Sequence, residues 1–112
     1  MKANSRTVDG VEVIKLDGKI TIGSGDQQLR EIITNALNQG KNKILLDMSG
    51  VTFLDSSGVG ALVSLFVSRQ HAGKKLALAS LTKQGLAVLQ VSGLTKLIPA
   101  YATVEEAVSA EK

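Results

Sequence analysis

The chain has 112 residues, of which 44% are hydrophobic and 21% charged, and its net charge is +3 at neutral pH. This is the size and balance of one folded domain, which we expect to cover residues 1–112. The sequence has no cysteine and one histidine, His71, which excludes disulfides, thiol nucleophiles and zinc sites with sulfur ligands. We expect neither a metal ion nor a cofactor.

Charge and hydrophobicity also indicate where the protein works. The lysines are scattered over several segments, and aromatic residues make up only 3% of the chain, so we expect no binding to nucleic acid. The longest mostly apolar stretch, from Asp55 to Arg69, would reach about 20 Å as a helix, short of the roughly 30 Å of a bilayer core. The first residues have no apolar run of a targeting signal. We therefore expect a cytoplasmic protein without membrane insertion.

The first half of the chain predicts a hairpin and a helix. Arg6–Val8 and Val11–Leu16 are typical of two short strands, joined by an Asp-Gly dipeptide that fits a two-residue turn. A glycine-rich loop, Ile22–Gly25, follows, and Asp26 is expected to cap a helix that ends at Gly40. The apolar stripe of that helix is Leu29, Ile32, Ile33, Ala36 and Leu37.

A central strand and a second helix come next. The nearly continuous apolar run Lys43–Met48 predicts a strand that is covered on both faces, and 49–55 is expected to be a loop. Apolar residues then recur at helical spacing until Gly73, and Leu76–Ala79 is expected to be another buried strand. The predicted core stripe of the helix is Val59, Leu62, Val63, Phe66 and Val67.

The last third predicts two shorter helices around a brief strand. Thr82 is expected to cap a helix that stops at Gly93, Leu97–Ile98 to form a final strand, and Thr103 to cap the last helix through a capping box with Glu106. Alternating helices and strands require a largely parallel sheet. The predicted fold is α/β, with a mixed sheet of four or five strands that opens with a β-hairpin and about four helices packed on it.

One segment, Asp55-Ser56-Ser57-Gly58-Val59-Gly60, places two hydroxyls and a carboxylate at the start of a helix. Its simplest interpretation is a helix cap. A serine nucleophile is excluded, because the only histidine lies at the far end of the same helix, about 20 Å away. Asp47 and Asp55 alone do not make a metal site. A phosphate on Ser56, by contrast, would lie beside free amides at the positive end of the helix dipole, and the fold would tolerate it.

The same segment resembles the Asp-Ser-Ser/Thr-Gly-apolar-Gly motif of the STAS superfamily, specifically of bacterial anti-sigma-factor antagonists. The resemblance extends along the chain through Gly18, the strand before the motif and the Ser92-Gly93-Leu94 ending of a C-terminal helix. It implies a single STAS domain that acts as a binding module and kinase substrate rather than as an enzyme.

The resemblance also implies roles for individual residues. The phosphorylated serine falls on Ser56, and Asp55, Ser57 and Gly58 flank it as partner contacts. The implied partners are a serine kinase that is itself an anti-sigma factor, which the unmodified protein sequesters to free a sigma factor, and a phosphatase that resets Ser56. The free protein is expected to be a monomer.

The chain departs from the family in the loop after the second predicted strand. Lys19 and Thr21 stand where two acidic residues are common, and the loop carries extra glycines at Gly23 and Gly25. We expect Lys19, Thr21 and Gly23 to contact the partner from an exposed loop and to change which kinase is recognised. Two alternatives stay open: an accessory or scaffold STAS domain, associated with a transporter or a stress-signalling complex, without a phosphate cycle, and a domain that binds a small molecule at the glycine-rich loop.

Overall fold

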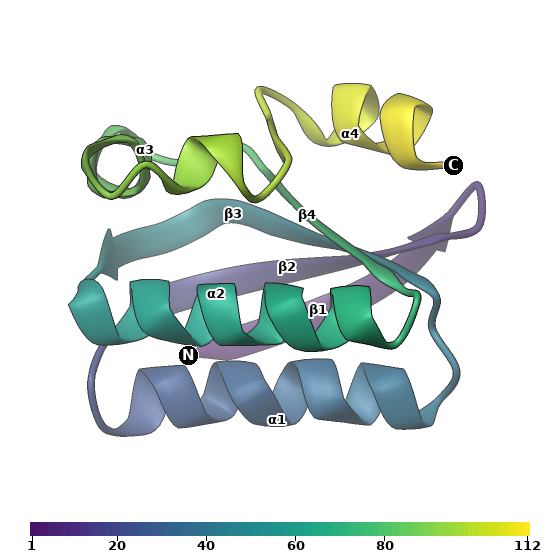
Figure 1. Ribbon diagram of the computed structural model, residues 1–112, viewed down its shortest axis with the longest axis horizontal. Helices are drawn as coiled ribbons and strands as arrows, with labels where there is room; N and C mark the ends of the chain where they lie inside the picture. Colours follow the sequence, from purple (N-terminus) through teal and green to yellow (C-terminus); the bar gives the residue numbers. More distant parts are fainter.

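A five-stranded mixed sheet, in the order β1-β2-β3-β4-β5, is the centre of the computed structural model, which describes residues 1–112 (Figure 1). Only the first pair of strands is antiparallel, as the predicted hairpin requires. The other neighbours are parallel. The strands are β1 (Lys2–Val8), β2 (Val11–Ile20), β3 (Lys43–Leu54), β4 (Lys75–Ala79) and β5 (Ala100–Tyr101).

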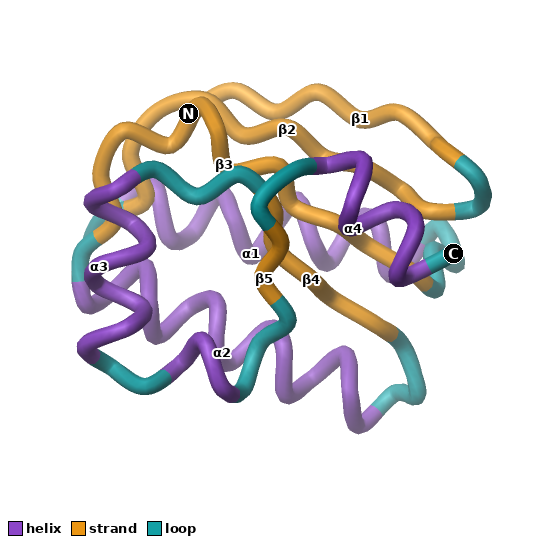
Figure 2. Tube along the Cα trace, turned by 90° about the horizontal axis from the view of Figure 1, so that it is seen from above, coloured by secondary structure: helices purple, strands orange, loops and turns teal.

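Helices cover both faces of this sheet. On one face, α1 (Ser24–Asn38) and α2 (Ser56–His71) lie side by side, whereas α4 (Val104–Glu111) packs on the opposite face (Figures 1 and 2). Leu89 of α3 (Lys83–Val91) joins the core beneath α1 and α2, and a short 3-10 helix, η1 (Leu94–Lys96), follows it. The predicted α/β architecture is confirmed. None of the helices is long and apolar enough to span a bilayer.

Alternation along β3 divides the core in two. Ile44 and Leu46 face the larger cluster with α1 and α2, while Leu45 faces the smaller cluster under α4. This confirms that β3 is a central strand buried on both faces. The stripe on α2 is rotated from the predicted one: Leu62 is fully buried, but Val63 is only half-buried and Val67 is 38% exposed. Their places are taken by the buried residues Ala61 and Leu65.

Local signals for turns and caps are confirmed at several points. Asp9 and Gly10 have φ angles of 49° and 79°, the left-handed conformations of a two-residue hairpin turn. The hydroxyl of Thr82 accepts a hydrogen bond from the Gly85 amide at 3.2 Å. The hydroxyl of Thr103 accepts one from the Glu106 amide at 3.1 Å. These caps satisfy amides that the first turn of a helix leaves unpaired.

The sheet strands near the motif are longer than predicted. β3 continues to Leu54, so the expected loop over 49–55 is wrong, and β2 continues through Lys19 to Ile20. The two extensions pair with each other, from Asp17 opposite Gly50 to Ile20 opposite Leu54. Polar residues and register shifts interrupt the apolar pattern here, which hid the strands from a reading based on hydrophobicity.

β1 also begins earlier than predicted, at Lys2. An exposed edge strand needs no apolar residues, so a pattern of apolar residues does not mark its start. The final strand is wrongly predicted at Leu97–Ile98 and lies instead at Ala100–Tyr101. Pro99 lacks an amide hydrogen and cannot donate within a ladder, but its carbonyl accepts a bond from the Leu78 amide at 2.9 Å, and pairing starts there.

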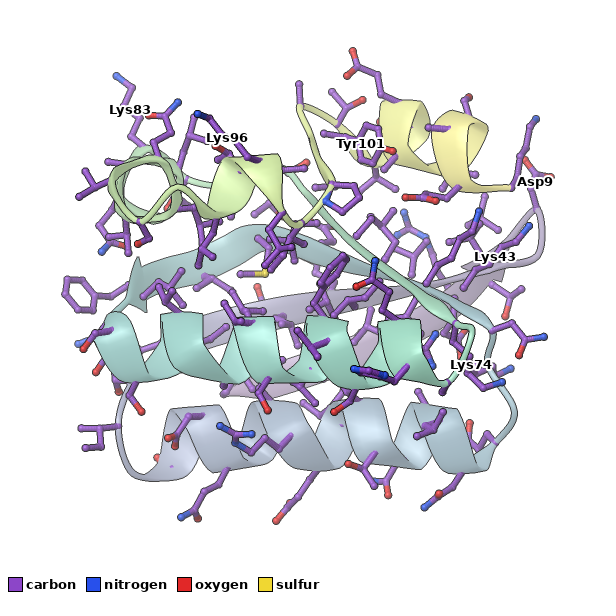
Figure 3. The ribbon with its side chains drawn as sticks, in the orientation of Figure 1. Asp9, Lys43, Lys74, Lys83, Lys96 and Tyr101 are labelled. Atoms are coloured by element: carbon purple, nitrogen blue, oxygen red, sulfur yellow. The ribbon has the colours of Figure 1, made fainter.

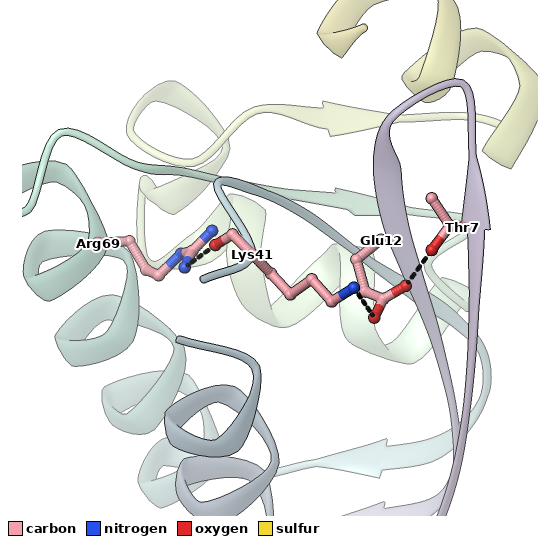
Figure 4. Close-up of polar contacts among 4 residues, drawn as sticks. All are labelled: Thr7, Glu12, Lys41 and Arg69. Atoms are coloured by element: carbon pink, nitrogen blue, oxygen red, sulfur yellow. Dashed lines mark hydrogen bonds and ion pairs between the residues drawn. The ribbon is translucent and has the colours of Figure 1, made fainter. Parts of the chain in front are cut away.

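The end of the sheet where β3 and β4 begin is held by a chain of polar contacts (Figure 4). Thr7 donates a hydrogen bond to the Glu12 carboxylate at 2.9 Å, and the ammonium of Lys41 lies 3.6 Å from the same carboxylate. The guanidinium of Arg69, near the end of α2, donates to the Lys41 carbonyl at 2.8 Å. This network joins the hairpin, the loop before β3 and α2.

Four labelled lysines lie at two different ends of the molecule. Lys43 and Lys74 lie at the end where β3 and β4 begin, whereas Lys83 begins α3 and Lys96 ends η1 (Figure 3).

Candidate functional site

The DSSGVG motif lies where β3 passes into α2, and Asp55 connects two loops there. One carboxylate oxygen of Asp55, Oδ1, accepts a hydrogen bond from the Gly58 amide at 2.8 Å, so Asp55 is the N-cap of α2. The other oxygen, Oδ2, accepts a bond from the Ile22 amide at 3.0 Å. A single carboxylate therefore fixes the glycine-rich loop against the start of the helix.

These two amide bonds, first that of Gly58 and then that of Ile22, hold the pKa of Asp55 below its ordinary value of 3.8. The ionised form thus stabilises the fold above the unfolded-state pKa, and that contribution is lost as the pH falls through the lower folded-state value. In a carboxyl-carbon NMR titration, we expect a midpoint for Asp55 below 3.8. Asp55→Asn should be less stable than the parent at pH 7, and the gap should narrow in strong acid. A midpoint at or above 3.8 would contradict the bridging role.

Ser56 is the first residue of α2. Ser56 is exposed, and its hydroxyl makes no hydrogen bond within the molecule. At this position the backbone amides of the first helical turn and the helix dipole favour negative charge. Ser56 is thus an accessible hydroxyl at the N-terminal end of a helix.

Ser57 has different surroundings from Ser56. It is half-buried, and its hydroxyl donates a hydrogen bond to Asp26 Oδ2 at 2.8 Å. Asp26 was expected to cap α1, but that helix begins at Ser24 with Gly23 as its N-cap, so the expected cap is wrong. Asp26 instead lies in the first turn of α1 and connects that turn to α2.

Glycines allow the two loops to approach each other. A β-carbon on the buried Gly58 would overlap the Ile20 carbonyl oxygen and lie 2.7 Å from Leu54 Cδ1. A β-carbon on Gly25 would lie 3.1 Å from the Ile20 Cα. Gly23 is exposed and has a φ of 101°, a conformation that side chains rarely adopt. Gly58 and Gly25 therefore both allow a close approach to Ile20, whereas Gly23 allows a backbone conformation.

Lys19 and Thr21 lie beside this junction, although not both on a loop as expected. Lys19 is the exposed, next-to-last residue of β2, opposite Phe53 of β3, and the expected loop position is wrong. Thr21 follows the strand and is half-buried, and its carbonyl accepts a hydrogen bond from the Asp26 amide at 3.1 Å. All the predicted contact residues thus lie at one end of the sheet.

Sequence reasoning missed Gln84, which supports the motif from α3. Its side-chain amide accepts a hydrogen bond from the Leu54 amide at 3.0 Å and donates one to the Leu54 carbonyl at 2.9 Å. β4 pairs with β3 only as far as Asp47. Beyond that point, the side chain of Gln84 makes the hydrogen bonds to the Leu54 backbone that β4 does not make. No local pattern reveals a contact between residues 30 positions apart. Ile22 and Phe53, which are 78% and 44% exposed, add apolar surface near Asp55.

The chemistry available here is limited. His71 ends α2, about 20 Å from Ser56, so no Ser-His pair forms. No cluster of three His, Cys, Asp or Glu side chains could hold a metal ion. The junction offers one free hydroxyl, a fixed carboxylate and exposed surface for a partner.

Comparisons with known proteins identify the family of this chain. The STAS domain model matches residues 2–107. A Thermotoga maritima protein provisionally named an anti-sigma factor antagonist is 28% identical over 102 residues, covering 91% of this chain and 90% of that protein. Its crystal structure superimposes with a TM-score of 0.89 at 26% identity, covering 97% of this chain and 93% of the other.

Two other relatives are informative. The phosphorylated form of the Bacillus cell fate determinant SpoIIAA superimposes with a TM-score of 0.71 at 26% identity, covering 97% of this chain and 98% of the other. A probable sulfate transporter of Arabidopsis thaliana is 30% identical over 103 residues, which cover 82% of this chain but 15% of the transporter. The motif, the fold and the match over residues 2–107 agree, and the chain belongs to the STAS domain family.

Proposed function

We propose that this protein is an anti-sigma-factor antagonist, switched by phosphorylation of Ser56. The unmodified form binds a serine kinase that is itself an anti-sigma factor and so frees a sigma factor. Phosphorylation by that kinase ends the complex, and a phosphatase restores the free hydroxyl. The protein is then a binding module and a substrate, active in the cytoplasm, and monomeric when free.

The observation that carries this proposal is the difference between Ser56 and its neighbours. Ser56 alone in the motif is exposed with an unbonded hydroxyl, whereas Asp55 and Ser57 are held by hydrogen bonds to other elements. The name of the Thermotoga relative supports the general role, and the phosphorylated form of SpoIIAA supports the switch.

The reaction needs no catalytic group from this chain. The Ser56 oxygen attacks the γ-phosphorus of ATP, the bond to the β,γ-bridging oxygen breaks, and ADP leaves while the hydroxyl proton passes to a base of the kinase. The product carries nearly two negative charges on an exposed helix terminus. The helix amides stabilise that phosphate locally, so the fold survives, but a surface that fits the neutral serine is repelled.

The recognition surface in this proposal surrounds Ser56. It comprises the motif residues Asp55, Ser57 and Gly58, and the adjoining Lys19, Thr21 and Gly23. Lys19 replaces an acidic residue common in the family, so the kinase that fits this surface offers an acidic or neutral group there. The exposed side chains of Ile22 and Phe53 call for an apolar contact as well.

Variants of Ser56 test the switch. Ser56→Asp should weaken binding of the kinase by at least about tenfold while the circular dichroism spectrum stays native, because the charge acts on the surface and not on the core. Ser56→Ala should bind like the parent and resist modification. Calorimetric titration with the kinase-type anti-sigma factor of the same organism measures the affinities, and mass spectrometry after incubation with ATP locates the phosphate.

Thr52→Asp is a matched control, since Thr52 is exposed on nearby β3 outside the proposed contact residues. It should leave binding within about threefold of the parent. If Ser56→Asp binds every partner as tightly as the parent and no phosphate forms on the motif, the phosphate cycle is wrong. An accessory role, as in the STAS segment of the sulfate transporter relative, then becomes the better interpretation.

A further inference from the structure

The two adjacent serines of the motif differ in a way that the motif itself does not explain. Both lie in the first turn of α2, and either hydroxyl would place a phosphate near the positive end of the helix. Only the Ser57 hydroxyl has a hydrogen-bond partner, which is Asp26 of α1. The Ser56 hydroxyl has none.

We infer that Asp26 is a positioning residue that confines phosphorylation to Ser56 by holding the Ser57 hydroxyl. This inference rests on the proposed function, and it assigns a role to a carboxylate outside the motif. Asp26 Oδ2 lies 2.8 Å from the Ser57 Oγ, the usual distance of a well-formed O–H···O hydrogen bond.

Asp26 is itself fixed, which gives its carboxylate a defined position. Its amide donates to the Thr21 carbonyl at 3.1 Å, and its second carboxylate oxygen, Oδ1, accepts a bond from the Gln27 amide at 2.8 Å. Gly25, directly before it, is packed against the Ile20 backbone, so the first turn of α1 cannot move away without losing that contact. The acceptor for Ser57 is therefore preorganised.

The bond to Asp26 and the half-burial act on Ser57 and not on Ser56, and repulsion by Asp26 adds to that of Asp55, which lies next to both serines. The Ser57 hydroxyl must break its bond to Asp26 before it can attack phosphorus, and its half-buried position restricts access. The Asp26 carboxylate repels the approaching γ-phosphate of ATP and would repel a phosphate formed on Ser57. Ser56 has no such neighbour bonded to its hydroxyl.

The absence of cysteine from the chain provides a test that needs no kinase. In Ser56→Cys and Ser57→Cys, each variant carries one thiol, and its rate of alkylation by iodoacetamide reports access and thiolate formation. A helix N-terminus favours the thiolate and a nearby carboxylate disfavours it. We expect Ser56→Cys to react at least about tenfold faster than Ser57→Cys at the same pH.

Removing the carboxylate should then affect only one position. Adding Asp26→Ala should raise the alkylation rate of Ser57→Cys several-fold, which closes part of its gap to Ser56→Cys, and leave Ser56→Cys within about twofold. Glu31→Ala, an exposed carboxylate further along α1, is the matched control and should change neither rate. Circular dichroism spectra of all variants establish that they are folded. Equal rates for the two thiols with Asp26 in place, or no response to Asp26→Ala, would overturn the inference.

Phosphate mapping in cells of the source organism separates this inference from the proposed function. With the native Asp26, phosphate should occur on Ser56 alone, and Asp26→Ala should add phosphate on Ser57. Phosphate on Ser56 alone in Asp26→Ala would overturn the role of Asp26 but leave the switch standing. If no phosphate forms on either serine while the thiol rates differ as expected, the switch is wrong and the control of hydroxyl access by Asp26 stands.

Discussion

Gly58→Ala should destabilise the protein by about 2 to 3 kcal/mol, the range of a methyl group forced into a fully packed site. The added β-carbon would overlap the Ile20 carbonyl oxygen and lie 2.9 Å from the Ile20 Cγ2, so β2 and α2 must separate. This separation also strains the two bonds of the Asp55 carboxylate, to Gly58 and Ile22. Urea unfolding followed by circular dichroism measures the change.

Gly60→Ala, two residues away in the same helix, is the matched control. A β-carbon there meets no atom within 4 Å, and Gly60 is exposed with an ordinary helical φ. Alanine in a helix interior is favoured over glycine by about 1 kcal/mol, so this variant should gain stability. If the two variants lose equal stability, the close approach of α2 to β2 at Gly58 is not what the motif glycine serves.

Local chemistry determined most of what the sequence predicted correctly. The hairpin turn at Asp9-Gly10, the Thr82 and Thr103 caps and the buried centre of β3 each depend on residues within a few positions of one another. The same holds for Asp55, because a carboxylate three residues before a helical amide is a local arrangement. The turn and the caps could be predicted because their free energy comes from short-range contacts, and the burial of β3 because its own run of apolar residues marks it.

Contacts between distant segments could not be predicted in that way. The Ser57–Asp26 bond joins residues 31 positions apart and the Gln84–Leu54 pair spans 30 positions, and neither pattern is visible along the chain. Asp26 in particular suited a helix cap by residue type, but Gly23 ends the loop earlier and Asp26 is left free to bind Ser57. The sequence thus indicated that Asp26 lies near the start of a helix, but the tertiary fold determines that it contacts Ser57.

The same limit applies to Arg69. Its place in the last turn of α2 does not indicate, from the sequence, that its side chain is buried. It is in fact 1% exposed, and this burial lowers the pKa of its guanidinium, because desolvation disfavours the charged form. No carboxylate bonds to it. Two of its hydrogen bonds go to the Lys75 carbonyl, from Nη2 at 2.8 Å and Nε at 3.3 Å. The third goes to the Lys41 carbonyl, from Nη1 at 2.8 Å, and is drawn in Figure 4.

Arg69→Met should cost about 3 kcal/mol of unfolding free energy, although methionine fits an apolar helix face. A buried ion pair can be replaced by apolar residues at little cost only when both partners are replaced, whereas here the backbone carbonyls stay and lose their donors. The loop before β3 and the start of β4 would then separate from the end of α2. Urea unfolding measures the loss, provided that the dependence of the unfolding free energy on urea concentration is the same in both proteins.

Arg30→Met on α1 is the control for the loss of one positive charge, since Arg30 is exposed and makes a single long bond of 3.4 Å to Ser64. It should change stability by less than about 0.5 kcal/mol. If Arg69→Met is equally mild, packing alone holds that end of the sheet and the guanidinium adds nothing to it. If the loss is near the expected value, with the thiol rates of Ser56→Cys and Ser57→Cys unchanged in the Arg69→Met background, the two ends of α2 have separate tasks. Both ends then contribute to stability, through Arg69 at one end and Gly58 and Asp55 at the other, but only the N-terminal end controls access to the serines.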